Sequence, residues 1–192
     1  SWRLQDRPDA LDLVRRVQQA HTDLGRLFED VRCYAGPMNL EIERCTLADV
    51  WRAAWDHLAE HRAGRAAQLV ELSGLDAECE ADAFRLEQVF RNIFDNSLAA
   101  CLDPVRIEVR CALKMLARRE AWSVSIHDNG PGLNEEQRTK IFEPFYTTKP
   151  KGTGLGMAIA RRVIEAHAGQ LQLGSEEPPG TELVIVLPKR VP

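Results

Sequence analysis

The chain has 192 residues, of which 44% are hydrophobic and 28% are charged, and its formal net charge is −4 at pH 7. This length and balance suit one soluble folded domain, or one domain with a helical appendage, rather than a disordered chain. Because the net charge is negative and the arginines are scattered, we expect no nucleic-acid partner. No apolar run is long enough to span a bilayer, so we expect no membrane contact within these residues.

The cysteines are odd in number and widely spaced, at Cys33, Cys45, Cys79, Cys101 and Cys111. This pattern predicts neither a disulfide framework nor a zinc site. We interpret them as reduced thiols of a cytoplasmic protein that pack as small hydrophobic groups. The chain has no initial methionine and no signal-peptide pattern, so we expect a fragment whose upstream part can hold a sensor region or a membrane anchor.

The first predicted element is a helix over residues 8–35, with Asp6 as a candidate cap, Pro8 in its first turn and Gly36–Pro37 at its end. Apolar and ring-bearing residues recur at alternating spacings of three and four, at Val14, Val17, His21, Leu24, Phe28, Val31 and Ala35. A helix with one apolar stripe needs a partner. The spacing therefore favours a coiled coil or bundle, and packing against the chain's own domain is the alternative.

Short strands and two helices follow. We predict an extended stretch at 39–44, a helix from Thr46, strands at 67–72 and 79–81, and a strong helix at 82–102. Thr46 and Asp49 resemble a capping box at the start of the first of these helices. The strong helix has apolar positions at Phe84, Leu86, Val89, Phe90, Ile93, Phe94 and Leu98.

Period-two alternation predicts strands around 105–113 and 122–126. Beyond them we predict a turn at 128–133, a short helix at 134–141, a polar loop at 147–154, a helix at 155–168, and a hairpin of 170–174 with 182–187 through the turn at 176–180. Strands and helices do not alternate regularly. The order therefore predicts an α+β fold, a two-layer sandwich in which helices cover one face of a mixed sheet.

Two amides, Asn92 and Asn96, lie four residues apart and so share one face of the strong helix. Amide oxygens are hard neutral ligands that suit a magnesium ion already carrying phosphate oxygens. The alternative is a pair of surface amides.

Asp128 follows an alternating strand, where its carboxylate could accept a hydrogen bond from an exocyclic amine, and Gly130 and Gly132 allow close approach of the backbone to a flat ring. A plain Asp-Asn-Gly turn is the alternative there.

Residues 152–156 are rich in glycine and open a helix, where backbone N–H groups can bind phosphate. Thr147, Thr148, Lys149 and Thr153 add hydroxyls and positive charge, and Lys151 directly precedes Gly152 in the same loop. The spacing matches neither a Walker A loop nor a dinucleotide fingerprint. A flexible loop is the alternative, and both interpretations hold for a lid that orders when a phosphate-bearing ligand binds. Just before it, Phe142 and Phe145 are expected to pack and hold that lid.

In this order the segments resemble the ATP-binding domain of sensor histidine kinases, which has the GHKL or Bergerat fold. The similarities are to the N box at 85–100, the G1 box at 128–132, the F box at 141–145 and the G2 box at 152–156. The run from Glu143 to Lys149 resembles the nitrogen-regulation type of kinase. The resemblance implies a catalytic domain at 39–192, and residues 1–38 look like the second helix of the dimerisation and phosphotransfer hairpin.

The resemblance also implies roles for single residues. Asn96 would coordinate Mg²⁺, Asn92 and Lys149 would act in catalysis beside the phosphates, and Asp128 would bind the adenine amino group. Thr181 would reach the adenine through a water molecule. Other nucleotide contacts are implied for Gly130, Gly132, Phe145, Thr147, Thr148, Gly152, Thr153, Gly154, Leu155 and Gly156.

The activity so implied is transfer of the γ-phosphoryl group of Mg-ATP to a histidine, for relay to an aspartate of a response-regulator receiver domain. His21 lacks the acidic neighbour of a phosphoacceptor and lies on the heptad seam, so we expect the acceptor helix upstream and no self-phosphorylation by this fragment. The implied partners are that acceptor helix, the receiver domain and, in the full-length protein, a second copy of the chain. The alternatives are a degenerate nucleotide-binding or interaction module, and a gyrase-like ATPase, which would need a glutamate where Asn92 stands.

Overall fold

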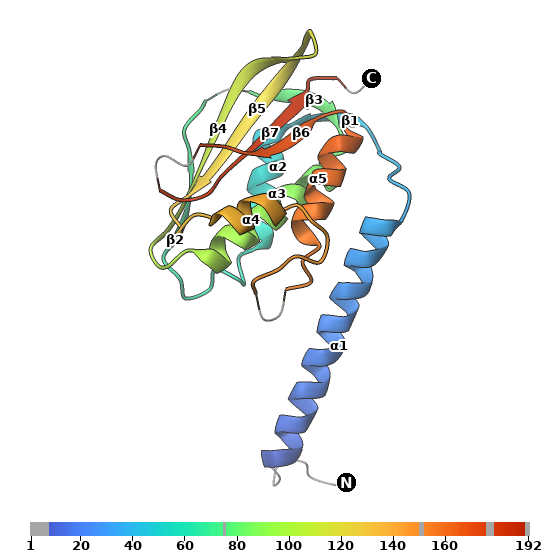
Figure 1. The fold of residues 1–192 in the computed structure, drawn as a ribbon, viewed down its shortest axis with the longest axis vertical. Coiled ribbons are helices and arrows are strands. Elements are labelled where there is room, and N and C mark those ends of the chain that lie inside the picture. The colour runs from blue at the N-terminus through green and yellow to red at the C-terminus, as the bar shows by residue number, and fades with distance from the viewer. Residues whose placement is uncertain (1–7, 75, 150–151, 176–178, 191–192) are drawn as a thin grey trace.

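The computed structural model describes residues 8–74, 76–149, 152–175 and 179–190, and it consists of a long helix attached to an α/β body (Figure 1). The predicted cap Asp6, Lys151 of the polar loop and residues 176–178 of the last turn lie outside the described residues. The long helix is α1, Pro8–Ala35, which has the predicted bounds.

The body is built on a five-stranded mixed sheet in the order β2-β4-β5-β7-β6. The strands are β2 (Ala67–Glu71), β4 (Val105–Leu116), β5 (Arg119–Asp128), β6 (Gln170–Leu173) and β7 (Glu182–Pro188). The pair β2–β4 is parallel and the other pairs are antiparallel. Val109 opposes Ile126, and Val124 opposes Ile185, which aligns the buried side chains of neighbouring strands on one face.

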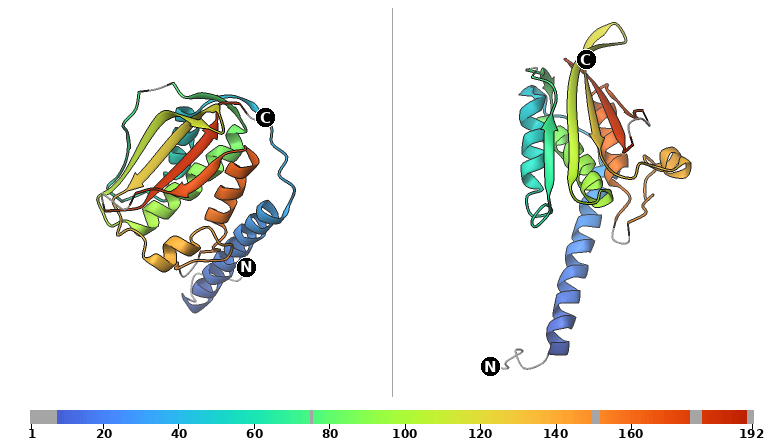
Figure 2. Two further views of the ribbon diagram at one scale, coloured as in Figure 1. Left: turned by 45° about the horizontal axis from the view of Figure 1, so that its top comes forward. Right: turned by 90° about the vertical axis from the view of Figure 1, so that its left-hand side faces the viewer.

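That face is covered by three helices, α2 (Leu47–His57), α3 (Ala83–Ala100) and α5 (Gly156–Ala166), which lie behind the sheet in the left view of Figure 2. Between α2 and α3, Trp51 meets Phe90 edge-on with ring centroids 6.1 Å apart. The other face of β4 is polar and carries an Arg106–Glu108 ion pair of 2.9 Å. The predicted two-layer α+β sandwich is therefore confirmed, because a sheet with one apolar face buries only that face.

A second sheet has two strands, β1 (Glu43–Thr46) and β3 (Glu78–Ala81), which pair antiparallel. The strand predicted at 39–44 thus begins and ends later in the chain. Thr46 is the N-cap of α2, but its side chain makes no capping hydrogen bond, so the predicted capping box is wrong. A complete capping box occurs instead at α4, Glu135–Lys140, between Asn134 and Gln137.

Two apolar side chains predicted to face the core are exposed. Phe84 is 73% exposed, because it lies in the first turn of α3 on the side turned away from the core. Leu113 is 53% exposed, because the tip of the β4–β5 hairpin extends beyond the helical layer (Figure 2). Period-two alternation thus predicted the strand correctly, but it could not predict where the helices that cover the strand end.

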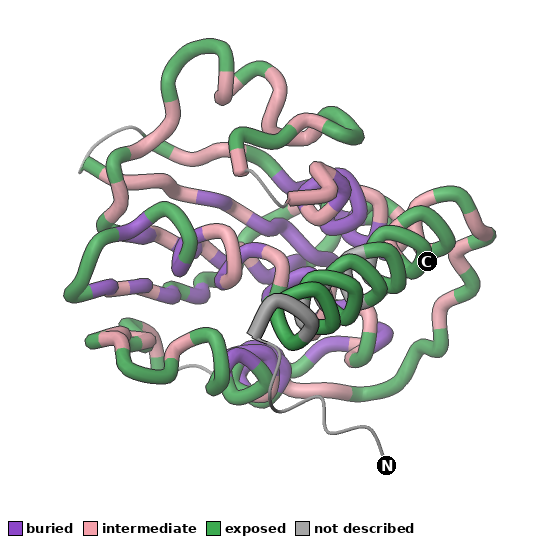
Figure 3. Tube along the Cα trace, turned by 90° about the horizontal axis from the view of Figure 1, so that it is seen from below, coloured by how far each residue is buried: buried purple, intermediate pink, exposed green. Residues whose placement is uncertain are grey.

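Helix α1 contacts the body only near its C-terminal end and is otherwise exposed, as Figure 3 shows. The guanidinium of Arg162 in α5 donates to the backbone carbonyls of Cys33 at 3.2 Å and Gly36 at 2.6 Å. These bonds satisfy carbonyls left unpaired at a helix end. The exposed apolar residues along α1 include Leu13, Val14, Val17, Leu24, Phe28 and Val31. Among the described residues, no helix is both long and apolar enough to cross a bilayer.

Candidate nucleotide-binding site

Asp128 ends β5 as one of the few buried charged residues of the body. Its Oδ2 accepts a hydrogen bond of 2.8 Å from the hydroxyl of Ser97 on α3. Its Oδ1 accepts from the backbone N–H groups of Gly130 at 3.0 Å and Thr181 at 3.1 Å. A carboxylate has about four lone-pair sites, so these three bonds leave it able to accept from one more donor.

The backbone around Asp128 leaves no space for side chains. A Cβ on Gly130 would lie 2.9 Å from Asp128 Oδ1, and one on Gly132, whose φ is +76°, would lie 3.1 Å from the Gly180 carbonyl oxygen. Gly180 has φ +131°, and a Cβ there would collide with the Asp128 carbonyl. The predicted glycines at 130 and 132 are thus needed for close backbone packing. Gly180 belongs to the same cluster, although its sequence signal indicated only a turn.

Asn96 and Lys149 meet although they are far apart in sequence. The Lys149 ammonium donates to Asn96 Oδ1 at 2.7 Å and lies 3.7 Å from Asp95 Oδ2. Burial lowers the pKa of Lys149, and the nearby Asp95 carboxylate opposes that shift. The predicted metal-binding amide and the predicted phosphate-binding lysine therefore lie side by side, with Asp95 as a neighbour that sequence analysis missed.

Asn92 lies where α3 crosses the start of α5. Its amide nitrogen donates to the Gly156 carbonyl at 2.9 Å. A Cβ on Gly156 would be 3.6 Å from the Asn92 amide carbon, which is ordinary contact. Residues 92, 96 and 97 of α3 thus reach Gly156, Lys149 and Asp128 respectively. One helix joins all three parts of the predicted site.

The polar loop is folded tightly on itself. The Thr147 hydroxyl accepts from the Lys149 N–H at 3.1 Å, and a Cβ on Gly152 would lie 2.5 Å from that hydroxyl. Thr148 is exposed in the same loop. Leu155, which precedes α5, is fully buried, so only its backbone can face a ligand.

The two aromatic residues before the loop behave differently. Phe142 packs against the core, as predicted, with the Arg161 guanidinium 5.5 Å from its ring centroid. The prediction that Phe145 packs is wrong, because its side chain is 63% exposed and its φ is +66°. This unusual backbone allows Gly154, with φ +70°, to lie directly on the Phe145 backbone, where any Cβ would collide.

Helix α1 also reaches the loop. The Thr153 hydroxyl donates to the Asp30 carboxylate at 2.7 Å and accepts weakly from the Leu155 N–H at 3.3 Å. Sequence analysis did not predict this contact, which joins residues 123 positions apart.

In the described parts of the chain, no group of three or more His, Cys, Asp or Glu residues could hold a metal ion. A cation here would have to use amide oxygens together with ligands from the nucleotide.

Comparisons with known proteins agree with this geometry. A family model described as histidine kinase-, DNA gyrase B- and HSP90-like ATPase matches residues 81–191. Sporulation kinase E of Bacillus subtilis is 39% identical over 112 residues, which are 58% of this chain and 14% of that protein. The histidine-protein kinase AtoS of Escherichia coli is 36% identical over 129 residues, 66% of this chain and 21% of AtoS. The chain therefore spans only a small part of these relatives.

Solved structures show the same fold. The catalytic domain of histidine kinase ThkA superposes with a TM-score of 0.67 at 30% identity, over 78% of this chain and 97% of that one. Full-length ShkA in complex with AMPPNP has a TM-score of 0.75 at 24% identity, over 92% of this chain and 38% of that one, a likeness of fold alone. The chain belongs to the histidine kinase-, DNA gyrase B- and HSP90-like ATPase family, and it has the fold of a sensor histidine kinase's catalytic ATP-binding domain.

Proposed function

We propose that this chain binds Mg-ATP and serves as the catalytic part of a sensor histidine kinase, which transfers the γ-phosphoryl group to a histidine. The observation that carries the proposal is the arrangement on α3. Its residue Asn92 contacts Gly156 at the start of α5, Asn96 contacts Lys149 in the polar loop, and Ser97 contacts Asp128 at the end of β5. Relatives with matching sequence include the histidine-protein kinase AtoS and the sensor histidine kinase ZraS of Escherichia coli, which supports the same activity.

Asp128 would bind the adenine. Its carboxylate is held by Ser97 and by the Gly130 and Thr181 N–H groups, and its remaining lone pair can accept from the exocyclic amine. Gly130 and Gly132 would let the ring lie against backbone. Thr181 would act through the N–H that positions Asp128, in addition to the water-mediated contact that the resemblance implies.

The phosphates would lie between α3 and the loop. Mg²⁺ would supply charge neutralisation on the triphosphate, and Asn96 fits it because its amide oxygen already contacts a cation, the Lys149 ammonium. Binding would release Lys149 from Asn96 so that its ammonium reaches a phosphate oxygen. Asn92 would orient the phosphates. The remaining contacts are proposed for backbone or hydroxyl groups of Phe145, Thr147, Thr148, Gly152, Thr153, Gly154, Leu155 and Gly156.

This chemistry needs positioning and charge stabilisation rather than a nucleophile in this chain. We propose that the phosphoacceptor helix lies upstream, that residues 1–38 belong to a dimerisation and phosphotransfer hairpin, and that residues 39–192 form the catalytic domain of the nitrogen-regulation type. The exposed apolar face of α1 supports pairing with the acceptor helix and with a second copy. Because the proposed substrate is ATP, this part of the protein would act in the cytoplasm.

A response-regulator receiver domain is the proposed recipient of the phosphoryl group. ThkA, whose catalytic domain is 30% identical to this chain, has been solved as a kinase in complex with the response regulator TrrA. Phosphoryl transfer from a histidine to an aspartate of such a partner would complete the relay.

Calorimetric titration with a non-hydrolysable ATP analogue, with and without Mg²⁺, tests the binding. We expect Mg²⁺-dependent binding that weakens by about 10-fold in Asn96→Ala, since one ligand is lost. The exposed Asn39→Ala is the matched control and should bind normally. Absence of binding by the unmodified chain would establish a degenerate module instead.

Phosphotransfer is tested by adding the upstream helical part of the full-length protein as a separate chain, together with ATP labelled at the γ-phosphate. We expect acid-labile label on the added chain and none on this one. Label on His21 would contradict the upstream location of the acceptor. Release of free phosphate without labelled histidine would indicate an ATPase.

A further inference from the structure

Two cysteines lie opposite each other in the small β1–β3 sheet. Cys45 and Cys79 are register partners, and their sulfur atoms are 3.8 Å apart. Directly opposed residues of an antiparallel pair have Cα atoms about 4.5–5.5 Å apart and side chains on the same face. A disulfide requires about 4.4–6.8 Å between the Cα atoms. The two strands can therefore be bridged without rearrangement of the backbone.

The two thiols differ in their exposure and in the direction of their pKa shifts. The hydrogen bond with Cys79 lowers the pKa of Cys45, while burial and the carboxylates of Glu43 and Asp82 oppose that shift. The same hydrogen bond, reinforced by burial, raises the pKa of Cys79. Cys45 is also the more exposed of the two, at intermediate exposure against 4% for Cys79. Cys45 is thus suited to attack an oxidant and Cys79 to attack Cys45 afterwards.

Other buried thiols are less suited to this chemistry. Burial raises the pKa of Cys101 to about 12 and that of Cys111 to about 11, which disfavours the reactive thiolate. Cys111 lies close enough to influence Cys79 electrostatically, but β1 places Cys45 directly opposite Cys79. The pairing of β1 with β3 therefore favours Cys45 over Cys111 as the disulfide partner of Cys79.

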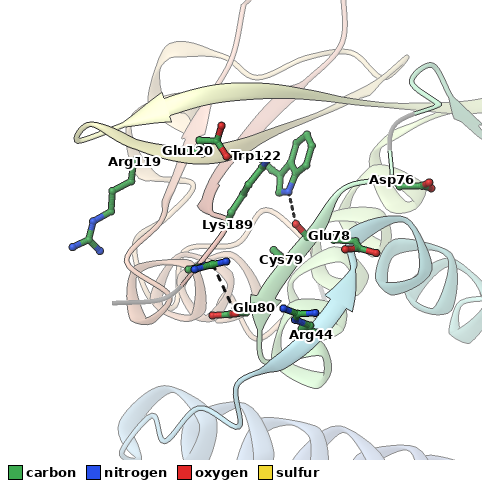
Figure 4. Close-up of a pocket in the computed structure, with 10 residues that line it drawn as sticks. Arg44, Asp76, Glu78, Cys79, Glu80, Arg119, Glu120, Trp122 and Lys189 are labelled. Carbon is green, nitrogen blue, oxygen red and sulfur yellow. Dashed lines mark hydrogen bonds and ion pairs between the residues drawn. The ribbon is translucent and has the colours of Figure 1, made fainter.

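Solvent reaches Cys45 through its own partial exposure, whereas its partner Cys79 borders a cavity. Cys79 lines a cavity of about 790 Å³ between β3, the start of β5 near the tip of the β4–β5 hairpin, and the residues at the end of β7, drawn in Figure 4. Trp122 forms part of its wall and donates from its indole nitrogen to the Glu78 carbonyl at 2.8 Å. The cavity lies away from Asp128 and Asn96, so it is separate from the proposed nucleotide site.

We propose that Cys45 and Cys79 form a reversible redox site, a dithiol that a hydroperoxide such as hydrogen peroxide converts to a cross-strand disulfide. The Cys45 thiolate attacks one peroxide oxygen and the O–O bond breaks, which leaves a sulfenic acid on Cys45 and hydroxide that takes up a proton. The Cys79 sulfur then attacks the Cys45 sulfur and displaces hydroxide, which leaves as water with the Cys79 proton. Two thiols lose two electrons and two protons, and the peroxide becomes two water molecules.

The disulfide would fix a junction of the fold. The chain enters β1 from α1, and β3 leads into α3 through Asp82, which accepts hydrogen bonds from the backbone N–H groups of Glu41 at 3.0 Å and Arg85 at 2.9 Å. Oxidation would therefore bind the exit of α1 covalently to the strand that precedes α3. Asn96 lies about 20 Å along α3 from this junction, at 1.5 Å per residue. Nucleotide affinity should be unaffected.

The experiment oxidises the reduced chain with hydrogen peroxide, alkylates the remaining thiols, and applies intact mass measurement and peptide mapping. We expect loss of two of the five thiols, with a cross-linked peptide pair containing Cys45 and Cys79. Dithiothreitol should restore both thiols. Closing this loop should raise the melting temperature by about 5–10 °C.

Single substitutions provide the controls. Cys111→Ser should still form the Cys45–Cys79 link, whereas Cys45→Ser should lose both the link and the rise in melting temperature. The inference is overturned if oxidation stops at a sulfinic acid on Cys45, if Cys79 pairs with Cys111, or if thiols are lost only on unfolding. ATP-analogue affinity is measured in both redox states. Failure to bind in both would refute the proposed nucleotide function and leave the redox site standing.

Discussion

The two ends of the candidate site are built differently. At the Asp128 end, the carboxylate is buried and its contacts come from Ser97 and two backbone N–H groups. At the loop end, Lys149 and Thr153 are held by Asn96 and Asp30, side chains that nucleotide binding would have to release or accommodate. The end proposed for the adenine is thus preformed, whereas the end proposed for the phosphates is closed by internal contacts. This difference predicts that mutations at the two ends have separable effects on stability and binding.

The largest effect is expected for Asp128→Ala. The substitution leaves the Ser97 hydroxyl and the Gly130 and Thr181 N–H groups without their acceptor, which should cost about 2–4 kcal/mol of unfolding free energy. ATP-analogue affinity should fall by about 100-fold, because the acceptor for the adenine amine is also lost. Urea unfolding and calorimetry measure both. The exposed Asp56→Ala should change neither.

Lys149→Ala should separate binding from stability. The lysine side chain is 36% exposed, so its removal should change the unfolding free energy by less than about 0.5 kcal/mol. ATP affinity should nevertheless fall by about 10-fold, because a cation is lost beside the phosphates. Lys189→Ala removes a lysine from the far side of the body, where it pairs with Glu120, and is the control. A loss of stability equal to that of Asp128→Ala would show that the loop end is preformed too.

Much of the preformed end was predictable because its signals are local. Period-two alternation identified β4 and β5, and the residue after such a strand, Asp128, lies where the sequence suggested. Helical periodicity placed Asn92 and Asn96 on one face of α3. Sequence analysis did not single out Ser97 as a site residue, because its bond to Asp128 joins a helix to a strand end that are 31 residues apart.

The closed end and the small sheet were less predictable because their contacts are tertiary. No local pattern relates Asp30 to Thr153, or Cys45 to Cys79. The exposed Phe145 was predicted to pack, because apolarity alone does not reveal a left-handed backbone that accommodates Gly154. Sequence analysis also described the cysteines as unpaired hydrophobic groups, since strand pairing across intervening elements cannot be read from spacing.

Acid should weaken the junction between the end of α5 and the start of α3, which lies outside both ends of the candidate site. His167 is buried where α5 ends, donates from Nδ1 to the Val163 carbonyl at 2.8 Å, and accepts at Nε2 from the Asp82 N–H at 3.0 Å. Burial lowers the pKa of His167, opposed by the Val163 carbonyl and Asp82. The unfolded state therefore binds this proton more readily than the folded state, so this contribution to stability is complete above about pH 6.5 and is lost as the pH falls below it.

Denaturant unfolding between pH 8 and pH 5 measures this dependence. His167→Gln, whose amide can both donate and accept, should be less stable at pH 8 and should show a flatter decline on acidification. An unchanged slope in the variant would assign the acid sensitivity to other groups.

The smallest effect is expected at the contact between α1 and the loop. The Asp30 carboxylate that holds Thr153 would lie near the phosphates of bound ATP and repel them. Asp30→Asn keeps an acceptor for the Thr153 hydroxyl but removes the charge, so ATP affinity should rise by about 3-fold, with a weaker gain at high salt. Adenosine carries no phosphate and should bind both proteins equally.

If adenosine affinity rises with that of ATP, the contact restrains the adenine end as well, and the division between a preformed and a closed end fails. If Asp30→Ala strengthens ATP binding far beyond Asp30→Asn, then the hydrogen bond itself, rather than its charge, keeps the loop closed, and α1 acts on the nucleotide site by holding Thr153.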